Sequence, residues 1–149
     1  MTAAESWRLA FRQRGTNNTL VMARGSTHWN DFLQAYLMIA QPDIMHSGAA
    51  GEIYAAKAPN PQGPWTDAVL VAQHNSTGSM LGNSAGGTYT AAASNLYNPT
   101  QHAFLDRHGG EIVYFSGTFS TSFSSQETAT PRYDYNSLMY RLNLSDVAL

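Results

Sequence analysis

Short apolar segments, separated by turn-forming residues, dominate this sequence of 149 residues. Each is of strand length and is bounded by clusters of Gly, Pro, Asn or Asp, which is the pattern of β-strands joined by turns. Helices are not favoured, because no stretch of a dozen residues keeps apolar side chains at i, i+3, i+4 and i+7. The pattern therefore predicts an all-β fold of antiparallel strands. The segments span residues 7–14, 19–25, 33–41, 51–58, 68–74, 102–107, 111–120 and 136–144.

A short turn between the first two segments adds detail to this prediction. The residues Gly15-Thr16-Asn17-Asn18 separate two segments with alternating character. Gly and Asn tolerate the backbone conformations of tight hairpin turns, so residues 7–14 and 19–25 are predicted to pair as a β-hairpin.

Two groups of residues recur in the same order along the chain. Trp29-Asn30 precedes a predicted strand and then Gly51-Glu52-Ile53, and Tyr97-Asn98 precedes a predicted strand and then Gly110-Glu111-Ile112. Repeated units of roughly 40 to 50 residues with about four strands are typical of β-propeller blades. We therefore expect antiparallel four-stranded sheets arranged as about two to two and a half propeller blades.

The repeat also suggests how one β-propeller-like domain over residues 1–149 would be divided. The expected parts are a partial blade over 1–28, a blade over 29–75, a Gly/Ser/Ala-rich loop over 76–96 and a blade over 97–149. Closed propellers have at least about four blades, and two blades alone would expose sheet faces and strand edges. Three arrangements stay open: a partial propeller whose N-terminal blades are missing, completion by homo-oligomerisation or a partner, or a compact sandwich.

Composition excludes several classes of function. Only 12% of the residues are charged, the net charge is −2, and the eight Lys and Arg residues are scattered singly. Such a chain has no basic stripe to neutralise a phosphate backbone, so no nucleic-acid partner is expected. The longest apolar run, residues 35–40, is too short to cross a bilayer, so no membrane partner is expected. The sequence has no cysteine, which excludes disulfides and thiolate metal sites.

Several strings resemble a known superfamily. GEIYAAKAPNPQGPWTDAVLVAQHN, YNPTQHAFLDRHGGEIVYFSGTFSTSF and TPRYDYNSLMYRLNLSD resemble the C-terminal blades of the five-bladed β-propeller glycoside-hydrolase-like superfamily, the arabinanase and levansucrase type. The nearest likeness is to its uncharacterised bacterial members, and it covers residues 29–146. The resemblance implies a carbohydrate-active protein that binds or hydrolyses a poly- or oligosaccharide at one propeller face.

The same resemblance implies a secreted or periplasmic location, although the N-terminal residues lack the apolar segment of a signal peptide. In such glycosidases the acidic nucleophile or base comes from the first blade, and no residue here matches it. The pattern leaves two functions open: a glycoside hydrolase, and a non-catalytic carbohydrate-binding or assembly module that completes a propeller by oligomerisation.

Glycoside hydrolysis needs two carboxyl groups, one protonated as an acid and one ionised as a base or nucleophile. Glu52 begins a segment with little charge nearby, which makes it a candidate for a partly buried acid. Glu111 holds the equivalent place in the second repeat, so an architectural role for both is the alternative. Asp134 is the second catalytic candidate.

The string PRYDYN carries Asp134 together with two candidate substrate-binding residues. In an extended segment Arg132 and Asp134 would lie on one side and Tyr133 on the other. An Arg fork, a carboxylate and aromatic rings suit the hydroxyls and C–H faces of a sugar. An Arg–Asp pair that pins a loop to the next strand is the structural alternative.

A third candidate group precedes the segment 102–107. Asn98, Gln101 and His102 would stand where the innermost strand of a blade begins, so the ring of His102 could point into the central channel. A hydrogen-bonded structural histidine is the first interpretation, and a substrate contact, with Asn98 and Gln101 beside it, is the alternative. No protein-bound metal or other cofactor is expected, because a metal site needs three or four converging ligands and no such cluster accompanies His102. A structural cation near His102 is the one exception left open.

Overall fold

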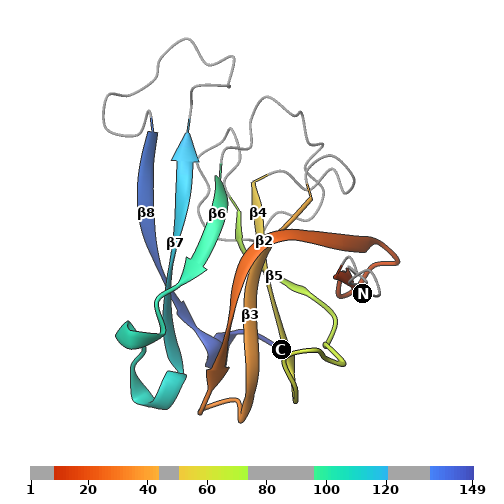
Figure 1. Ribbon diagram of the computed structural model, residues 1–149, viewed down its shortest axis with the longest axis horizontal. Helices are drawn as coiled ribbons and strands as arrows, with labels where there is room; N and C mark the ends of the chain where they lie inside the picture. The colour runs from red at the N-terminus through yellow and green to blue at the C-terminus, as the bar shows by residue number, and fades with distance from the viewer. Residues whose placement is uncertain (1–8, 44–50, 74–95, 121–134) are drawn as a thin grey trace, which may run out of the picture.

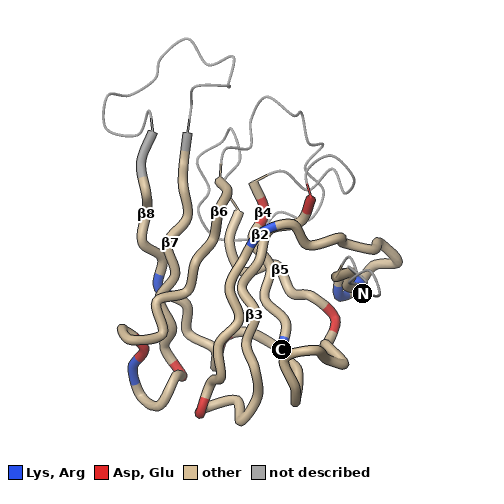
Figure 2. Tube along the Cα trace, viewed as in Figure 1, with Lys and Arg blue, Asp and Glu red and all other residues tan. Residues whose placement is uncertain are grey.

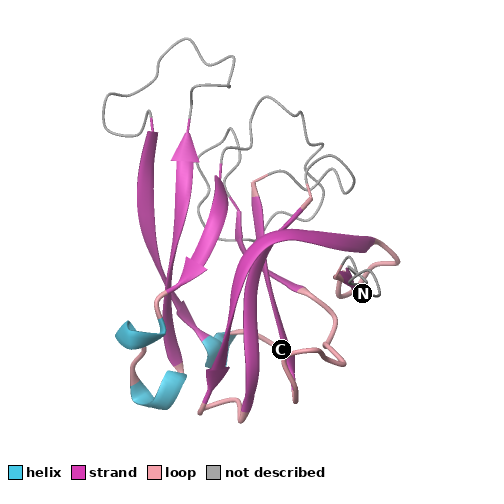
Figure 3. Cartoon of the chain, in the orientation of Figure 1, coloured by secondary structure: helices cyan, strands magenta, loops and turns pink. Residues whose placement is uncertain are grey.

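The computed structural model describes residues 9–43, 51–73, 96–120 and 135–149, and all statements below concern these residues. They form two antiparallel sheets, which confirms the prediction of an all-β fold (Figures 1 and 3). The five-stranded sheet has the order β1-β2-β3-β4-β5, with bounds Ala10–Arg12, Thr19–Asn30, Ala35–Pro42, Glu52–Ala58 and Val69–Gln73. The three-stranded sheet has the order β6-β7-β8, with bounds Leu96–Gln101, Ile112–Ser120 and Tyr135–Asn143.

Three short 3-10 helices complete the described structure. They are η1 (Ala103–Leu105), η2 (His108–Gly110) and η3 (Leu144–Asp146). The first two lie between β6 and β7 at the lower end of the molecule as drawn in Figure 1. In the described part of the chain, no helical segment has the length and apolarity needed to span a bilayer.

The five-stranded sheet carries apolar side chains on both faces. Successive side chains of a strand point to opposite sides, and the central strands are apolar at nearly every position. On β3, Leu37 and Ile39 enter the core between the two sheets, whereas Met38 and Ala40 enter a second core on the other face. The first core also receives Phe115 of the three-stranded sheet. The sheets therefore pack face to face, and β1 covers the second core.

A bend in β2 makes this covering possible. The strand pairs with β3 over most of its length, has a bulge between Met22 and Arg24, and pairs with β1 at its beginning. At Gly25 an added Cβ would lie 2.5 Å from the carbonyl oxygen of Ile39, which no side chain could tolerate without movement. Glycine thus permits the close approach that curls the five-stranded sheet into a half-barrel.

The arrangement of the sheets is consistent with partial propeller blades. The first strand of the three-stranded sheet, β6, lies beside β2 and β3, and β7 and β8 follow outward from it (Figure 1). The strand counts are five and three rather than the expected four in each sheet. The β1–β2 hairpin is confirmed, with Gly15 at a φ of 76° in its turn.

The strand predictions fail at two places. Residues 102–107, expected to be a strand, instead contain η1, and the strand lies just before them as β6. The expected domain boundary after residue 28 falls inside β2. Hydrogen bonding to β3 extends to Asn30, so residues 19–30 belong to the same sheet as β3 to β5.

The sequence repeat does not match the structure strand for strand. Trp29-Asn30 ends β2, whereas Tyr97-Asn98 lies within β6. The Gly-Glu-Ile triplets lead into β4 and β7, which are the fourth strand of one sheet and the second of the other. Similar residues at strand ends therefore reflect similar turn requirements rather than equivalent strands.

Candidate functional site

Polar side chains join the two sheets where β6 runs beside β2. The Arg24 Nη1 atom on β2 donates a hydrogen bond of 2.7 Å to the Asn98 Oδ1 atom on β6. The backbone N–H of Gln101 donates to the Ser26 Oγ atom at 2.7 Å. We call these residues, together with Asp106, the β2–β6 seam. The seam brings together two of the three residues predicted in this part of the chain, Asn98 and Gln101.

The exposure of Asn98 has a local cause. The pairing of β6 with β7 shifts between Tyr97 and Thr100, and Asn98 takes a left-handed φ of 55° within that irregularity. Asn tolerates this conformation better than most residues. Its backbone N–H donates to the Oε1 atom of the buried Gln41 at 3.1 Å, so the backbone is fixed while the side chain stays exposed.

The buried Gln101 and the half-buried Asp106 form the inner end of the seam. The Gln101 side chain is 3% exposed, and its Nε2 atom donates to Asp106 Oδ2 at 3.1 Å. The backbone N–H of Tyr114 lies 3.4 Å from Asp106 Oδ1. Burial raises the pKa of Asp106, and the opposing effects of these two hydrogen bonds and of nearby His28 are smaller. The carboxyl group therefore takes up a proton more readily than an exposed aspartate does.

One atom of this group has no partner. The Gln101 Oε1 atom is buried and accepts no hydrogen bond in the part of the chain that the structure describes. Within the described residues, the amide is held through its Nε2 atom, which donates to Asp106.

His102 lies outside the strand that it was expected to begin. It follows β6 and caps η1, with its backbone N–H donating to the Tyr114 carbonyl at 2.8 Å. Its Nε2 atom lies 2.9 Å from Ser116 Oγ, and its ring meets Phe104 edge-on at 5.8 Å between centroids. These contacts are those of a histidine that is hydrogen-bonded within the fold.

Glu52 is not brought to the seam. Its Oε2 atom accepts a 2.5 Å hydrogen bond from the Tyr54 hydroxyl, which in turn accepts one of 3.1 Å from Gln13 Nε2. Tyr54 belongs to the second core, and Glu52, two residues earlier on β4, points to the same face. Gln41 lies two residues after Ile39 of the first core, so the side chain that accepts from Asn98 points to the other face. Glu52 and Asn98 are therefore on opposite faces of the five-stranded sheet.

The remaining predicted residues cannot be placed. Arg132, Tyr133 and Asp134 lie outside the described residues. Among the described residues, no group of three His, Asp or Glu side chains could hold a metal ion.

Sequence reasoning missed three residues at or beside the seam. Arg24 carries no local signal, because only the fold brings β2 beside β6. Asp106 lies in a segment predicted as a strand, where its contact with Gln101 could not be foreseen. Phe104, in the same segment, is 83% exposed.

Two aromatic residues, one at the end of β2 and one in the following turn, are also exposed. The side chains of Trp29 and Phe32 are each 45% exposed. Trp29 meets Tyr36 edge-on at 5.3 Å and donates to Asp31. Trp65, by contrast, packs edge-on against Phe11 as a covering residue of the second core.

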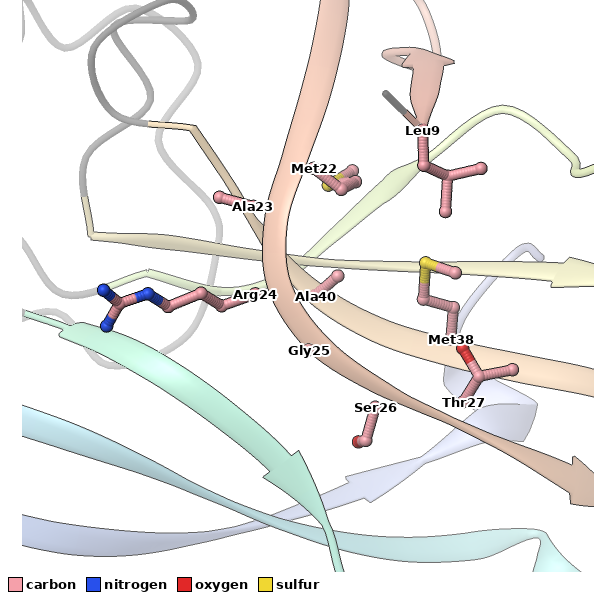
Figure 4. A pocket seen from close by; sticks show the side chains of 9 residues that line it. All are labelled: Leu9, Met22, Ala23, Arg24, Gly25, Ser26, Thr27, Met38 and Ala40. Atoms are coloured by element: carbon pink, nitrogen blue, oxygen red, sulfur yellow. The ribbon is translucent and has the colours of Figure 1, made fainter. Parts of the chain in front are cut away.

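A cavity of about 190 Å³ opens beside the bend of β2. Figure 4 shows Met38 and Leu9 on one side of the strand, whereas the Arg24 side chain points the other way, toward β6. The cavity is thus mainly apolar, and the guanidinium belongs to the seam. Charged residues elsewhere are scattered along the described trace, without a gathered basic stripe (Figure 2).

The fold and the seam define an all-β protein with blade-like antiparallel sheets and an amide, guanidinium and carboxyl group at the junction of two strands. Comparison with protein-family models, with curated proteins and with solved structures finds no match.

Proposed function

We propose that this protein is carbohydrate-active and binds a poly- or oligosaccharide along the β2–β6 seam. The observation that carries the proposal is the Arg24–Asn98 pair, which presents an exposed guanidinium and an exposed amide side by side. Planar groups of this kind offer paired hydrogen bonds to neighbouring hydroxyls. The low charge of the chain also fits a neutral ligand.

Exposed aromatic rings support the proposal. Trp29, Phe32 and Phe104 are large and at least 45% exposed. The β2–β3 turn and η1 lie at the same end of the molecule (Figure 1), where the Asn30 side chain ties the turn to η2 through a 2.8 Å hydrogen bond to Gly110. Aromatic faces stack on the C–H faces of sugar rings, and such surfaces need no charge.

The resemblance to propeller glycoside hydrolases extends the proposal to hydrolysis. Asp106 is the candidate acid for this role, because partial burial raises its pKa above the ordinary value, which is the direction that a general acid requires. Glu52, which lies on the opposite face of the sheet, is better suited to a structural role. The alternative function is a non-catalytic carbohydrate-binding or assembly module, and it rests on the same surface without the chemical step.

Glycan binding is tested by titrating the protein with soluble arabinan, levan and their oligosaccharides in a calorimeter. Arg24→Ala and Phe104→Ala are expected to weaken binding of the best ligand by about fivefold to tenfold each, from loss of one polar contact or one aromatic face. Arg12→Ala is the matched control, because the Arg12–Asp67 pair lies outside the seam. If both variants bind as the parent does, or if no glycan binds the parent, the proposal is wrong.

Product analysis separates the two functions. With a glycan that binds, release of reducing ends that is lost in Asp106→Asn while binding persists identifies the hydrolase. Binding without release identifies the non-catalytic module.

A further inference from the structure

The outer edge of β8 is a long strand edge, and among the described strands none pairs with it. The strand is nine residues long. Natural proteins protect such edges with Pro, with several charges or by keeping the strand short. The β8 sequence YNSLMYRLN has no Pro and one charge, Arg141, whereas the opposite edge strand of the other sheet, β5, has only five residues.

The hydrogen bonds of β7 reveal which β8 groups point outward. The Tyr114 carbonyl accepts from His102, so the backbone groups of Tyr114 and of Ser116 point toward β6. Ser116 is the register partner of Met139, in a β7–β8 pairing without irregularity. The N–H and C=O groups of Met139 must therefore point away from β7, as do those of Ser137 and Arg141.

The same strand is complementary to itself in antiparallel orientation. With Met139 on a two-fold axis, Met139 faces its own copy, Leu138 faces Tyr140 and Ser137 faces Arg141. Met139 is 55% exposed, so the pairing would cover an apolar side chain. Leu138 and Tyr140 both belong to the first core, so the apolar face would continue across the axis. No two like charges face each other across the axis. Like charges directly opposite each other would destabilise the pairing.

We propose that two copies of this chain associate through β8, which pairs antiparallel with its own copy about Met139. The two three-stranded sheets then become one six-stranded sheet, and the contact is isologous, with the same residues on both sides. The proposal is independent of glycan binding, because β8 contributes no residue to the β2–β6 seam.

Engineered cysteines test the register directly, since the chain contains no cysteine of its own. In the proposed pair the two Met139 Cα atoms would lie about 5.5 Å apart, within the range of a disulfide. The two Arg141 Cα atoms would lie roughly 13 Å apart, outside that range. Met139→Cys should thus cross-link under mild oxidation at least about tenfold faster than Arg141→Cys, a control on the same strand and face. A mixture of Ser137→Cys and Arg141→Cys should cross-link as a heterodimer.

Solution mass provides the second measurement. The parent protein should sediment with twice the 16.2 kDa mass of one chain at tens of micromolar, and Met139→Lys should be monomeric because two ammonium groups would meet on the axis. A single cooperative melting transition shows that the lysine variant is folded, and its midpoint should lie below that of the parent because the stabilising partner is lost. A monomeric parent, or equal cross-linking of Met139→Cys and Arg141→Cys, overturns the proposal. A dimer that Met139→Lys leaves intact also overturns it, because another surface then holds the copies together.

Discussion

The side chain of Asn30 joins the end of β2 to η2 across 80 residues of sequence. Its Nδ2 atom donates to the Gly110 carbonyl at 2.8 Å, and its Oδ1 atom accepts from the backbone N–H of Leu33 at 2.9 Å. Asn30 is 2% exposed. One amide thus satisfies a carbonyl of η2 and an N–H group of the β2–β3 turn.

Replacement of Asn30 should destabilise the fold. Asn30→Ala leaves both backbone groups without their partner, and we expect the free energy of unfolding to fall by about 1–3 kcal/mol. Urea unfolding followed by circular dichroism measures the change. Asn17→Ala, in the exposed β1–β2 turn, is the control and should change stability by less than about 0.5 kcal/mol. Equal effects of the two substitutions would contradict the structural role of Asn30.

Gly110 faces the same amide and tolerates no side chain. Its φ is 93°, and an added Cβ would lie 2.6 Å from Asn30 Nδ2. Gly109 also has a positive φ, of 64°, but an added Cβ there would meet nothing within 4 Å. Gly109→Ala should therefore cost about 1 kcal/mol from backbone strain alone, and Gly110→Ala should cost at least about 1 kcal/mol more from the contact. Thermal unfolding of both variants checks this order. A larger loss of stability in Gly109→Ala than in Gly110→Ala would contradict it.

Asp106 should give stability a pH dependence. The pKa of the folded carboxyl group is raised above its ordinary value near 3.8 by burial. Between the ordinary and the raised pKa the folded state holds more protons than the unfolded state, so stability falls as the pH rises through this window and recovers on acidification. Asp106→Asn removes this titration while keeping a polar group beside Gln101.

The measurement is the difference in melting temperature between Asp106→Asn and the parent from pH 7 down to pH 4. We expect the melting temperature of Asp106→Asn, relative to that of the parent, to be highest at neutral pH. As the pH falls, the parent gains stability and this difference should decrease. A difference that stays constant would show that Asp106 titrates alike in both states.

The Gln13–Tyr54–Glu52 chain should contribute stability rather than ligand binding. Tyr54→Phe removes the hydroxyl that donates to Glu52, and we expect a loss of about 1–2 kcal/mol in the free energy of unfolding. Tyr36→Phe, on the neighbouring strand β3, is the same chemical change at a half-buried site and should have a smaller effect. Any glycan affinity should be unchanged in Tyr54→Phe, because Tyr54 and the residue that holds Asn98 lie on opposite faces of the sheet.

Gly25 should be essential to the curl of the five-stranded sheet. Gly25→Ala places a methyl group 2.6 Å from the Ala40 Cβ atom, so β2 must move away from β3. We expect a loss of about 1–3 kcal/mol. Ala23→Ser, at the exposed bulge two residues earlier, is the control and should be nearly neutral. Both are compared by urea unfolding.

The sequence by itself determined where most of the strands lie and where the first hairpin turns. Apolar alternation placed β2, β3, β4, β7 and β8 near their observed positions, because that period follows from the geometry of one strand. Gly15 and Asn18 specified the first hairpin in the same way. The prediction of a strand over residues 102–107 was wrong, because the apolar residues of such a short run fit a 3-10 turn as well as a strand.

Only the tertiary structure decided which residues meet. Asn98 and Gln101 were predicted from their strings, but their partners Arg24 and Ser26 lie more than 70 residues away in the chain. The sequence could not show that β6 runs beside β2, that Glu52 faces away from the seam, or that Asp106 accepts a hydrogen bond from the buried Gln101. These relationships depend on the curl of one sheet and its packing on the other, which are properties of the whole fold rather than of any one segment.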